Sequence, residues 1–193
     1  MQRAEAWAIV TEFTQNPRLL NHMMAVEACM RAYARHYGED EERWGLIGLL
    51  HDFDYERYPE CPAHPLEGEK ILAARGVDPA IRYTICSHVD HVSDRYPRNS
   101  LVDRVLYAVD ELSGLVVATA LVRPTKSIFD VDVAAVQKKF KDKKFAAGVN
   151  REEVLHGAAE LGVPMEEHIA FVIQALQGSA DALGLRGVET TQA

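Results

Sequence analysis

The chain has 193 residues, the length of one domain or of one domain with a small appendage. Its 21 basic and 29 acidic side chains give a formal net charge of −8, which argues against a protein that coats nucleic acid polymers or anionic membranes. No uninterrupted apolar run approaches the roughly 18 residues of a membrane span. The three cysteines have no CxxC spacing and follow no secretory leader. We therefore expect a cytoplasmic protein with no membrane or nucleic acid polymer as partner and no disulfide framework.

Apolar residues recur at intervals of three and four along most of the chain, and sustained alternation is absent, which predicts an all-α protein. Asn16, Asp78, Ser100 and Asn150 stand where helix N-caps belong, and Gly38 stands where a helix ends. The predicted helices cover residues 3–15, 17–37, 40–52, 64–75, 79–89, 100–122, 132–139, 151–161 and 164–183.

The helices up to residue 122 are expected to form the core of a single helical-bundle domain, with residues 123–193 as a C-terminal helical extension packed on it. Residues 123–144 contain seven basic and three acidic residues, a net +4 in a chain whose other residues sum to −12. Such a segment is either a phosphate-facing surface or simply a solvated face. Its basic residues are Arg123, Lys126, Lys138, Lys139, Lys141, Lys143 and Lys144.

Two polar residues, His51 and Asp52, close the apolar segment 44–50. Neighbours on a helix point about 100° apart, so a ligand that both bind must lie near the helix end. A metal ion suits this geometry. The pair is equally compatible with a helix end that is capped into solvent.

Asp110 and His22 each lie on a largely apolar helix face. A desolvated carboxylate needs compensation by a metal or by a buried arginine, and a single buried histidine is often satisfied within the core. Together with His51 and Asp52, however, they provide two imidazoles and two carboxylates on three apolar helices. This set indicates a metal site.

The order His22, His51-Asp52, Asp110 resembles the signature of the HD superfamily of metal-dependent phosphohydrolases. Members with two metals carry two more histidines before the final aspartate, and His64 and His88 look like these. The resemblance covers roughly residues 17–122 and implies an HD-type helical bundle.

The resemblance also implies two metal sites that share Asp52 as a bridging ligand. The first would use His22, His51, Asp52 and Asp110, and the second would use Asp52, His64 and His88. Imidazole with carboxylate suits Fe, Mn, Zn, Co or Ni, so we expect one or two divalent ions of this group. Two such cations can lower the pKa of a shared water, which makes Asp52 a catalytic residue as well as a ligand.

The chain departs from the family just after the His-Asp pair, where Phe-Asp-Tyr-Glu-Arg replaces the frequent Ile-Gly-Lys. If the missing lysine binds phosphate, then Arg57, Arg123 and Lys126 are the candidate substrate-binding cations. Asp54 is a candidate catalytic group that steers a ligand or takes a proton, with a solvated loop carboxylate as the alternative. His91 is a candidate general acid, or a residue of a polar loop.

The leading hypothesis is a metal-dependent phosphohydrolase that cleaves a phosphate ester or anhydride of a nucleotide or other small phosphorylated metabolite. One alternative is symmetrical hydrolysis of dinucleoside polyphosphates, which other small two-metal members perform, and another is a monophosphatase for deoxynucleotides. Because some HD proteins activate oxygen at a di-iron pair, a di-iron oxygenase is an alternative from a different class. A sensor module that keeps its ligands without turnover is the last.

Overall fold

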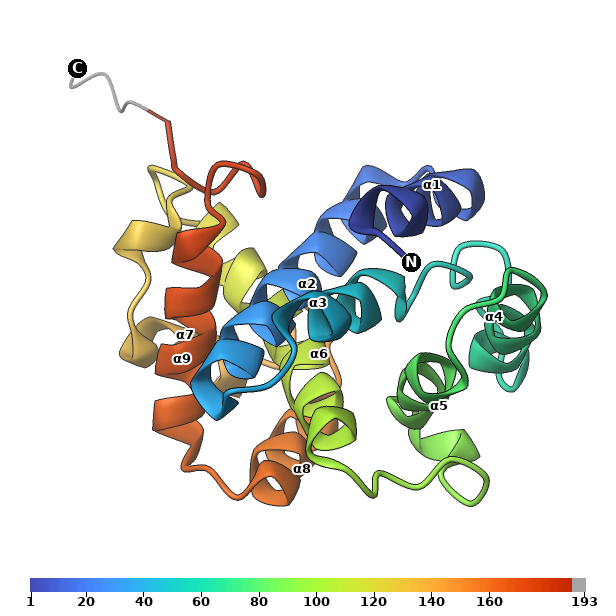
Figure 1. The fold of residues 1–193 in the computed structure, drawn as a ribbon. Helices are drawn as coiled ribbons and strands as arrows, with labels where there is room; N and C mark the ends of the chain where they lie inside the picture. The colour runs from blue at the N-terminus through green and yellow to red at the C-terminus, as the bar shows by residue number, and fades with distance from the viewer. Residues whose placement is uncertain (189–193) are drawn as a thin grey trace. The chain divides into compact units, whose positions relative to one another are not determined.

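The computed structural model describes residues 1–188, and in this range the chain is helical and contains no strand, which confirms the all-α fold (Figure 1). Two 3₁₀ turns, η1 (Asp90–Val92) and η2 (Ile128–Asp130), accompany the α-helices. The α-helices are α1 (Arg3–Phe13), α2 (Pro17–Tyr37), α3 (Glu41–Leu50), α4 (Ala63–Ala74), α5 (Pro79–Ser87), α6 (Leu101–Leu121), α7 (Val133–Lys141), α8 (Arg151–Leu161) and α9 (Met165–Gly178).

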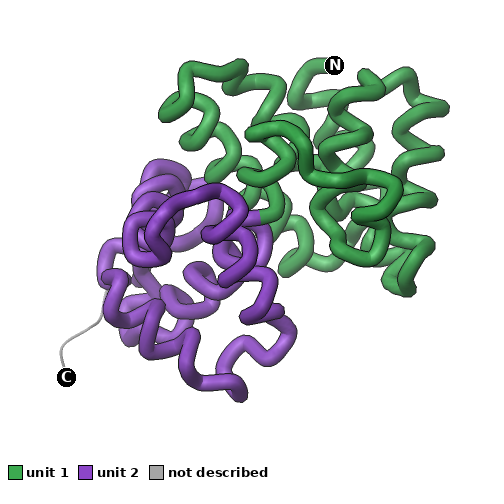
Figure 2. Tube along the Cα trace, turned by 90° about the horizontal axis from the view of Figure 1, so that it is seen from below, with its two compact units in different colours: residues 1–107 green, residues 108–193 purple. Residues whose placement is uncertain are grey.

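The chain forms two compact units, Met1–Tyr107 and Ala108–Ala193 (Figure 2). The division falls inside α6. The predicted domain boundary after residue 122 stays a prediction, as does the packing of an extension on the first domain.

The predicted N-caps are confirmed where the structure describes them. The Asn16 side chain accepts a hydrogen bond from the backbone of Arg18 at 2.9 Å, and that of Asp78 accepts one from Ala80 at 2.7 Å. Each satisfies an amide that the first turn of a helix leaves without an intrahelical acceptor. Gly38 ends α2 in the left-handed conformation at φ 72°, which a glycine adopts without a steric penalty.

The last helix is shorter than predicted, because α9 ends at Gly178 rather than near residue 183. The chain then turns, and the backbone N–H of Leu185 donates to the carbonyl of Ala180 at 2.8 Å. This turn buries Leu183 and Leu185. The apolar pattern after residue 178 therefore reflects a buried turn and not more helix.

In the first unit, α2 and α3 lie side by side with little space between their backbones (Figure 1). A Cβ atom added at Gly48 would lie 2.9 Å from the backbone nitrogen of Glu27, closer than real Cβ contacts allow. A glycine is therefore required for this approach. All residues of 44–50 are buried, so the end of α3, where His51 follows, is held against α2.

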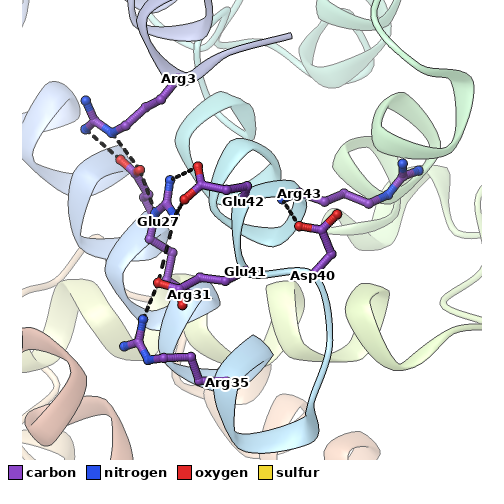
Figure 3. A network of polar contacts seen from close by, with 8 residues as sticks. All are labelled: Arg3, Glu27, Arg31, Arg35, Asp40, Glu41, Glu42 and Arg43. Carbon is purple, nitrogen blue, oxygen red and sulfur yellow. Dashed lines mark hydrogen bonds and ion pairs between the residues drawn. The ribbon is translucent and has the colours of Figure 1, made fainter.

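Charged residues on α1, α2 and α3 form a network that we call the Arg31 network (Figure 3). Glu27 is buried, and its carboxylate accepts from Arg3 at 2.7 and 2.8 Å and from Arg31 at 3.0 Å. Arg31 also donates to both oxygens of Glu42, at 2.7 and 3.0 Å. The members of the network are Arg3, Glu27, Arg31, Arg35, Glu41 and Glu42.

In the second unit, α8 and α9 contact α6, and the chain after α9 contacts η2. A Cβ at Gly157 of α8 would lie 2.6 Å from the Cα of Ala108, so α8 lies directly against α6 there. His168 of α9 donates through Nε2 to the carbonyl of Ala108 at 2.9 Å. The backbone N–H of Ile128 in η2 donates to the carbonyl of Leu185, also at 2.9 Å.

Among the helices in residues 1–188, none is both long enough and apolar enough to cross a membrane.

Candidate metal centre

His51 and Asp52 follow the last residue of α3, as the sequence predicts. His51 is fully buried, and its Nδ1 lies 2.8 Å from the carbonyl oxygen of Gly48. Because a carbonyl can only accept, Nδ1 is the nitrogen that carries the proton. The Nε2 atom of His51 is then the one with a lone pair for a metal.

His64 and His88 have the same arrangement. His64 has an extended backbone before Pro65, and its Nδ1 lies 2.9 Å from Oδ1 of Asp54. His88 follows α5, and its Nδ1 lies 2.5 Å from the carbonyl oxygen of Ile85. Both residues are buried. Each ring is thus oriented through Nδ1, which is the usual way in which a protein orients a metal-binding imidazole.

The histidine Nε2 atoms converge on the Asp52 carboxylate, whose two oxygens face different rings. Oδ1 lies 3.3 Å from Nε2 of His64 and 3.3 Å from Nε2 of His88. Oδ2 lies 3.6 Å from Nε2 of His51 and 3.8 Å from Nε2 of His22. We call these five residues, His22, His51, Asp52, His64 and His88, the Asp52 cluster.

These distances fit a metal site. The Nε2 atoms of His64 and His88 lie only 3.3 Å apart, although each ring is placed to present a lone pair there. Two lone pairs at this distance require a cation, either a proton or a metal. Ligands about 2.0–2.2 Å from a tetrahedral metal are separated by about 3.3–3.6 Å, which matches the spacing. His51, Asp52 and His88 also have ligand atoms within 4.8 Å of one another.

The electrostatics of the cluster favour a cation as well. Burial raises the pKa of Asp52, but His51, His64 and His88 outweigh this effect and hold the pKa well below its usual range. Burial lowers the pKa of His64, but hydrogen bonds to the carboxylates of Asp52 and Asp54 outweigh it and raise the pKa to about 10. Without a metal, His64 therefore holds a proton between two carboxylates, and a metal at its Nε2 takes the place of that proton.

The family model for the HD domain matches residues 19–115, half of the chain. The chain belongs to the HD domain family. This confirms the resemblance that the sequence suggested, since the HD domain is typical of a superfamily of metal-dependent hydrolases that bind divalent metals. Comparisons with the curated proteins and with the solved structures give no match.

Within this HD domain, Asp54 is buried and does not lie in a solvated loop. Its side chain is 1% exposed, Oδ1 accepts from His64 and Oδ2 accepts from the backbone N–H of Gly68 at 3.0 Å. The structure therefore shows that Asp54 contacts Nδ1 of His64, a predicted metal ligand. Its predicted catalytic role stays a prediction.

The other two candidates in the first unit have defined partners. His91 is exposed and contacts the backbone carbonyl of His64 through Nε2 at 3.0 Å. The guanidinium of Arg57 lies 4.1 Å from the centre of the Phe13 ring and donates to the carbonyl of Glu12. Arg57 is thus directed toward the end of α1, and the general-acid role of His91 and the phosphate-binding role of Arg57 stay predictions.

Three predicted site residues belong to the second unit. Asp110 is half-buried on α6, just past the division between the units. Arg123 and Lys126 follow the end of α6, and Lys126 adopts a positive φ of 53° in the turn there. Their predicted roles as metal ligand and substrate-binding cations stay predictions.

The sequence did not reveal how the rings of the HD domain are oriented. Two acceptors are backbone carbonyls three residues before the histidine, at Gly48 and Ile85, and a backbone group carries no signal in the residue type. The third acceptor, Asp54, was predicted as a candidate catalytic group and not as a partner of His64. The one available signal was Gly68, four residues after His64, where a small residue leaves space for that carboxylate.

Proposed function

We propose that this HD domain is a metal-dependent phosphohydrolase that cleaves a phosphate ester or anhydride of a nucleotide or another small phosphorylated metabolite. The observation that carries the proposal is the convergence of four imidazole Nε2 atoms on Asp52 at 3.3–3.8 Å. The HD superfamily supplies the coarser class, a metal-dependent hydrolase.

The donor set supports a divalent metal of borderline character. All donors in the Asp52 cluster are imidazole nitrogens or carboxylate oxygens, which suits Fe, Mn, Zn, Co or Ni. When bound, such metals supply an activated water and neutralise charge on a phosphoryl group. Because Oδ1 and Oδ2 of Asp52 face different histidines, the arrangement supports a proposal in which two ions would share Asp52. We propose Asp110 as a further metal ligand.

The protein groups would act by holding the metal ligands and orienting their rings. Gly48, Asp54 and Ile85 fix the rings of His51, His64 and His88 so that Nε2 of each is available. Rings that are already oriented lose little entropy when a metal binds, and they keep the reacting groups in a defined geometry. No nucleophilic side chain is needed, since the attacking group would be water.

The test combines metal analysis with a screen for released phosphate. Protein purified with and without oxygen is analysed for bound Fe, Mn, Zn, Co and Ni, and each loaded form is then tested on nucleotides, dinucleoside polyphosphates and sugar phosphates. We expect at least one metal per chain and phosphate release that is lost in Asp52→Ala but kept in His36→Ala, an exposed histidine of α2.

Two results would contradict the proposal. Protein that binds none of these metals under any condition would exclude a metal-dependent enzyme. A metal-loaded protein that consumes oxygen with an organic substrate, and that hydrolyses no phosphate compound, would favour the di-iron oxygenase instead.

A further inference from the structure

Asp54 contacts the predicted metal ligand His64 on the ring nitrogen that does not face the metal site. Its Oδ1 lies 2.9 Å from Nδ1 of His64, on the ring nitrogen opposite to the one that faces Asp52. The carboxylate is 1% exposed, so water is excluded from these contacts. Hydrogen bonds to an ionised group in such surroundings are among the stronger ones in proteins.

The second oxygen of Asp54 is held by the backbone. Oδ2 accepts from the N–H of Gly68 at 3.0 Å, one turn into α4. A Cβ atom added at Gly68 would lie 2.7 Å from the carboxyl carbon of Asp54, too close for any side chain to be accepted without a shift. The glycine and the aspartate therefore depend on each other, and the glycine gives the carboxylate its position.

His64 lies between two carboxylates. Asp52 Oδ1 lies 3.3 Å from its Nε2, and Asp54 Oδ1 lies 2.9 Å from its Nδ1. A metal-binding imidazole usually donates its other ring N–H to a carboxylate or a backbone carbonyl, which orients the ring. Asp54 at Nδ1 has this arrangement, with Nε2 of the same ring directed at Asp52.

We propose that Asp54 is a positioning residue for the metal that His64 binds: it orients the His64 ring and makes it a better donor, and Gly68 is the residue that lets it do so. This inference rests on the proposed metal site. It concerns one of the two expected metals, because His64 and His88 face Oδ1 of Asp52 whereas His22 and His51 face Oδ2.

The test is a calorimetric titration of metal-free full-length protein with Mn²⁺. It compares wild type with Asp54→Asn, Asp54→Ala and Gly68→Ala, and uses Asp94→Asn as the control, because Asp94 is an exposed carboxylate of the same unit. Loss of an outer hydrogen-bond partner lowers metal affinity about 10- to 100-fold. We expect a loss in this range for one metal per chain in Asp54→Ala and a smaller loss in Asp54→Asn, with the affinity of the other metal unchanged.

Gly68→Ala separates positioning from a general loss of charge, because it keeps both Asp54 and His64 in the sequence but displaces the Asp54 carboxylate. We expect it to weaken the same metal, and we expect the double variant Asp54→Ala/Gly68→Ala to bind no more weakly than Asp54→Ala alone, since both changes remove one interaction. The single variant Gly68→Ala also keeps the test decisive if Asp54→Ala does not fold. Nitrogen NMR of the Zn²⁺-loaded wild type should show His64 protonated at Nδ1.

A purely structural role predicts a different pattern, in which the variants lower the melting temperature of the metal-free protein and bind both Mn²⁺ ions with wild-type affinity. That pattern, or His64 protonated at Nε2 in the loaded protein, would overturn the inference and leave the proposed function standing. Wild-type protein that binds no Mn²⁺, Zn²⁺, Fe²⁺, Co²⁺ or Ni²⁺ would instead overturn the proposed function itself.

Discussion

Two polar regions of the first unit, the Asp52 cluster and the Arg31 network, lie on or beside the same pair of helices, α2 and α3, yet their composition differs in kind. The Arg31 network combines three arginines with three glutamates, so each charge has an opposite charge within reach (Figure 3). The Asp52 cluster combines four imidazoles whose Nε2 atoms converge on a single carboxylate. The charges of the Arg31 network balance one another, whereas the nitrogens of the Asp52 cluster are placed to bind a proton or a metal.

The difference shows how a structural polar group can be told from a site. A buried carboxylate accompanies each region, since Glu27 belongs to the network and Asp54 contacts His64 of the cluster, so burial alone does not separate them. What separates them is the type of atoms that face one another. Donors face acceptors in the network, whereas the Nε2 atoms of His64 and His88 face each other at 3.3 Å, so a proton or a metal must lie between them. Such a juxtaposition costs free energy unless a cation is supplied.

The largest expected effect in this comparison is at Asp52. Asp52→Ala should remove both metals, because its two oxygens face the two sets of histidines, whereas His64→Ala should remove chiefly one. Metal content per chain after gel filtration is the measurement. Equal metal content in wild type and Asp52→Ala would refute the bridging role and remove the distinction between the two regions.

The core that carries both regions should exclude thiol reagents. Burial raises the pKa of Cys29 and of Cys86 to about 12, so at pH 8 only about one thiol in ten thousand is a thiolate at either position. Cys61 is exposed. We expect Cys61 to be labelled at least about 100-fold faster than the other two in the native protein, and all three to be labelled alike in denaturant. Rapid native labelling of Cys29 would show that the core opens easily.

The Arg31 network should affect stability and not metal binding. Glu27→Gln removes the buried charge that Arg3 and Arg31 share and should lower the free energy of unfolding by about 1–3 kcal/mol, with metal content unchanged. Denaturant melts of the metal-free protein measure this. Glu42→Gln is the matched control, because Glu42 is an exposed partner of the same arginine, and it should destabilise the protein less than Glu27→Gln does. Loss of metal in Glu27→Gln would couple the regions and contradict the comparison.

The smallest effect is expected in the lysine segment of the second unit, where Lys143 and Lys144 are exposed. If these cations bind the distal phosphates of an extended substrate, Lys143→Ala/Lys144→Ala should raise KM about threefold at low salt with little change in kcat, and the effect should fade as salt increases. Lys70→Ala, an exposed lysine of the first unit, is the control. An unchanged KM for every phosphate compound at low salt would leave the segment as a solvated face and remove support for a dinucleoside polyphosphate substrate.

Much of the helical pattern could be predicted because its signals are local. The N-caps at Asn16, Asp78 and Asn150 and the glycine at position 38 act on their own helix turns, and the structure has helices beginning or ending at each. The predicted end of α9 was wrong, because a turn that hydrogen-bonds back to Ala180 buries Leu183 and Leu185. An apolar residue type does not show whether a helix or a turn buries the side chain.

The sequence by itself determined that the chain is helical and that His51-Asp52 closes a buried helix beside other metal-binding residue types, because residue type and spacing are enough to state both. It also determined the family, since the ordered positions of histidine and aspartate survive without any knowledge of geometry. Only the tertiary structure decided that Asp54 lies behind His64, that Gly68 makes room for it, and that the two oxygens of Asp52 face different rings. These facts depend on angles and distances of tenths of an ångström between segments far apart in sequence, and hydrogen bonds and metal bonds are sensitive to such differences.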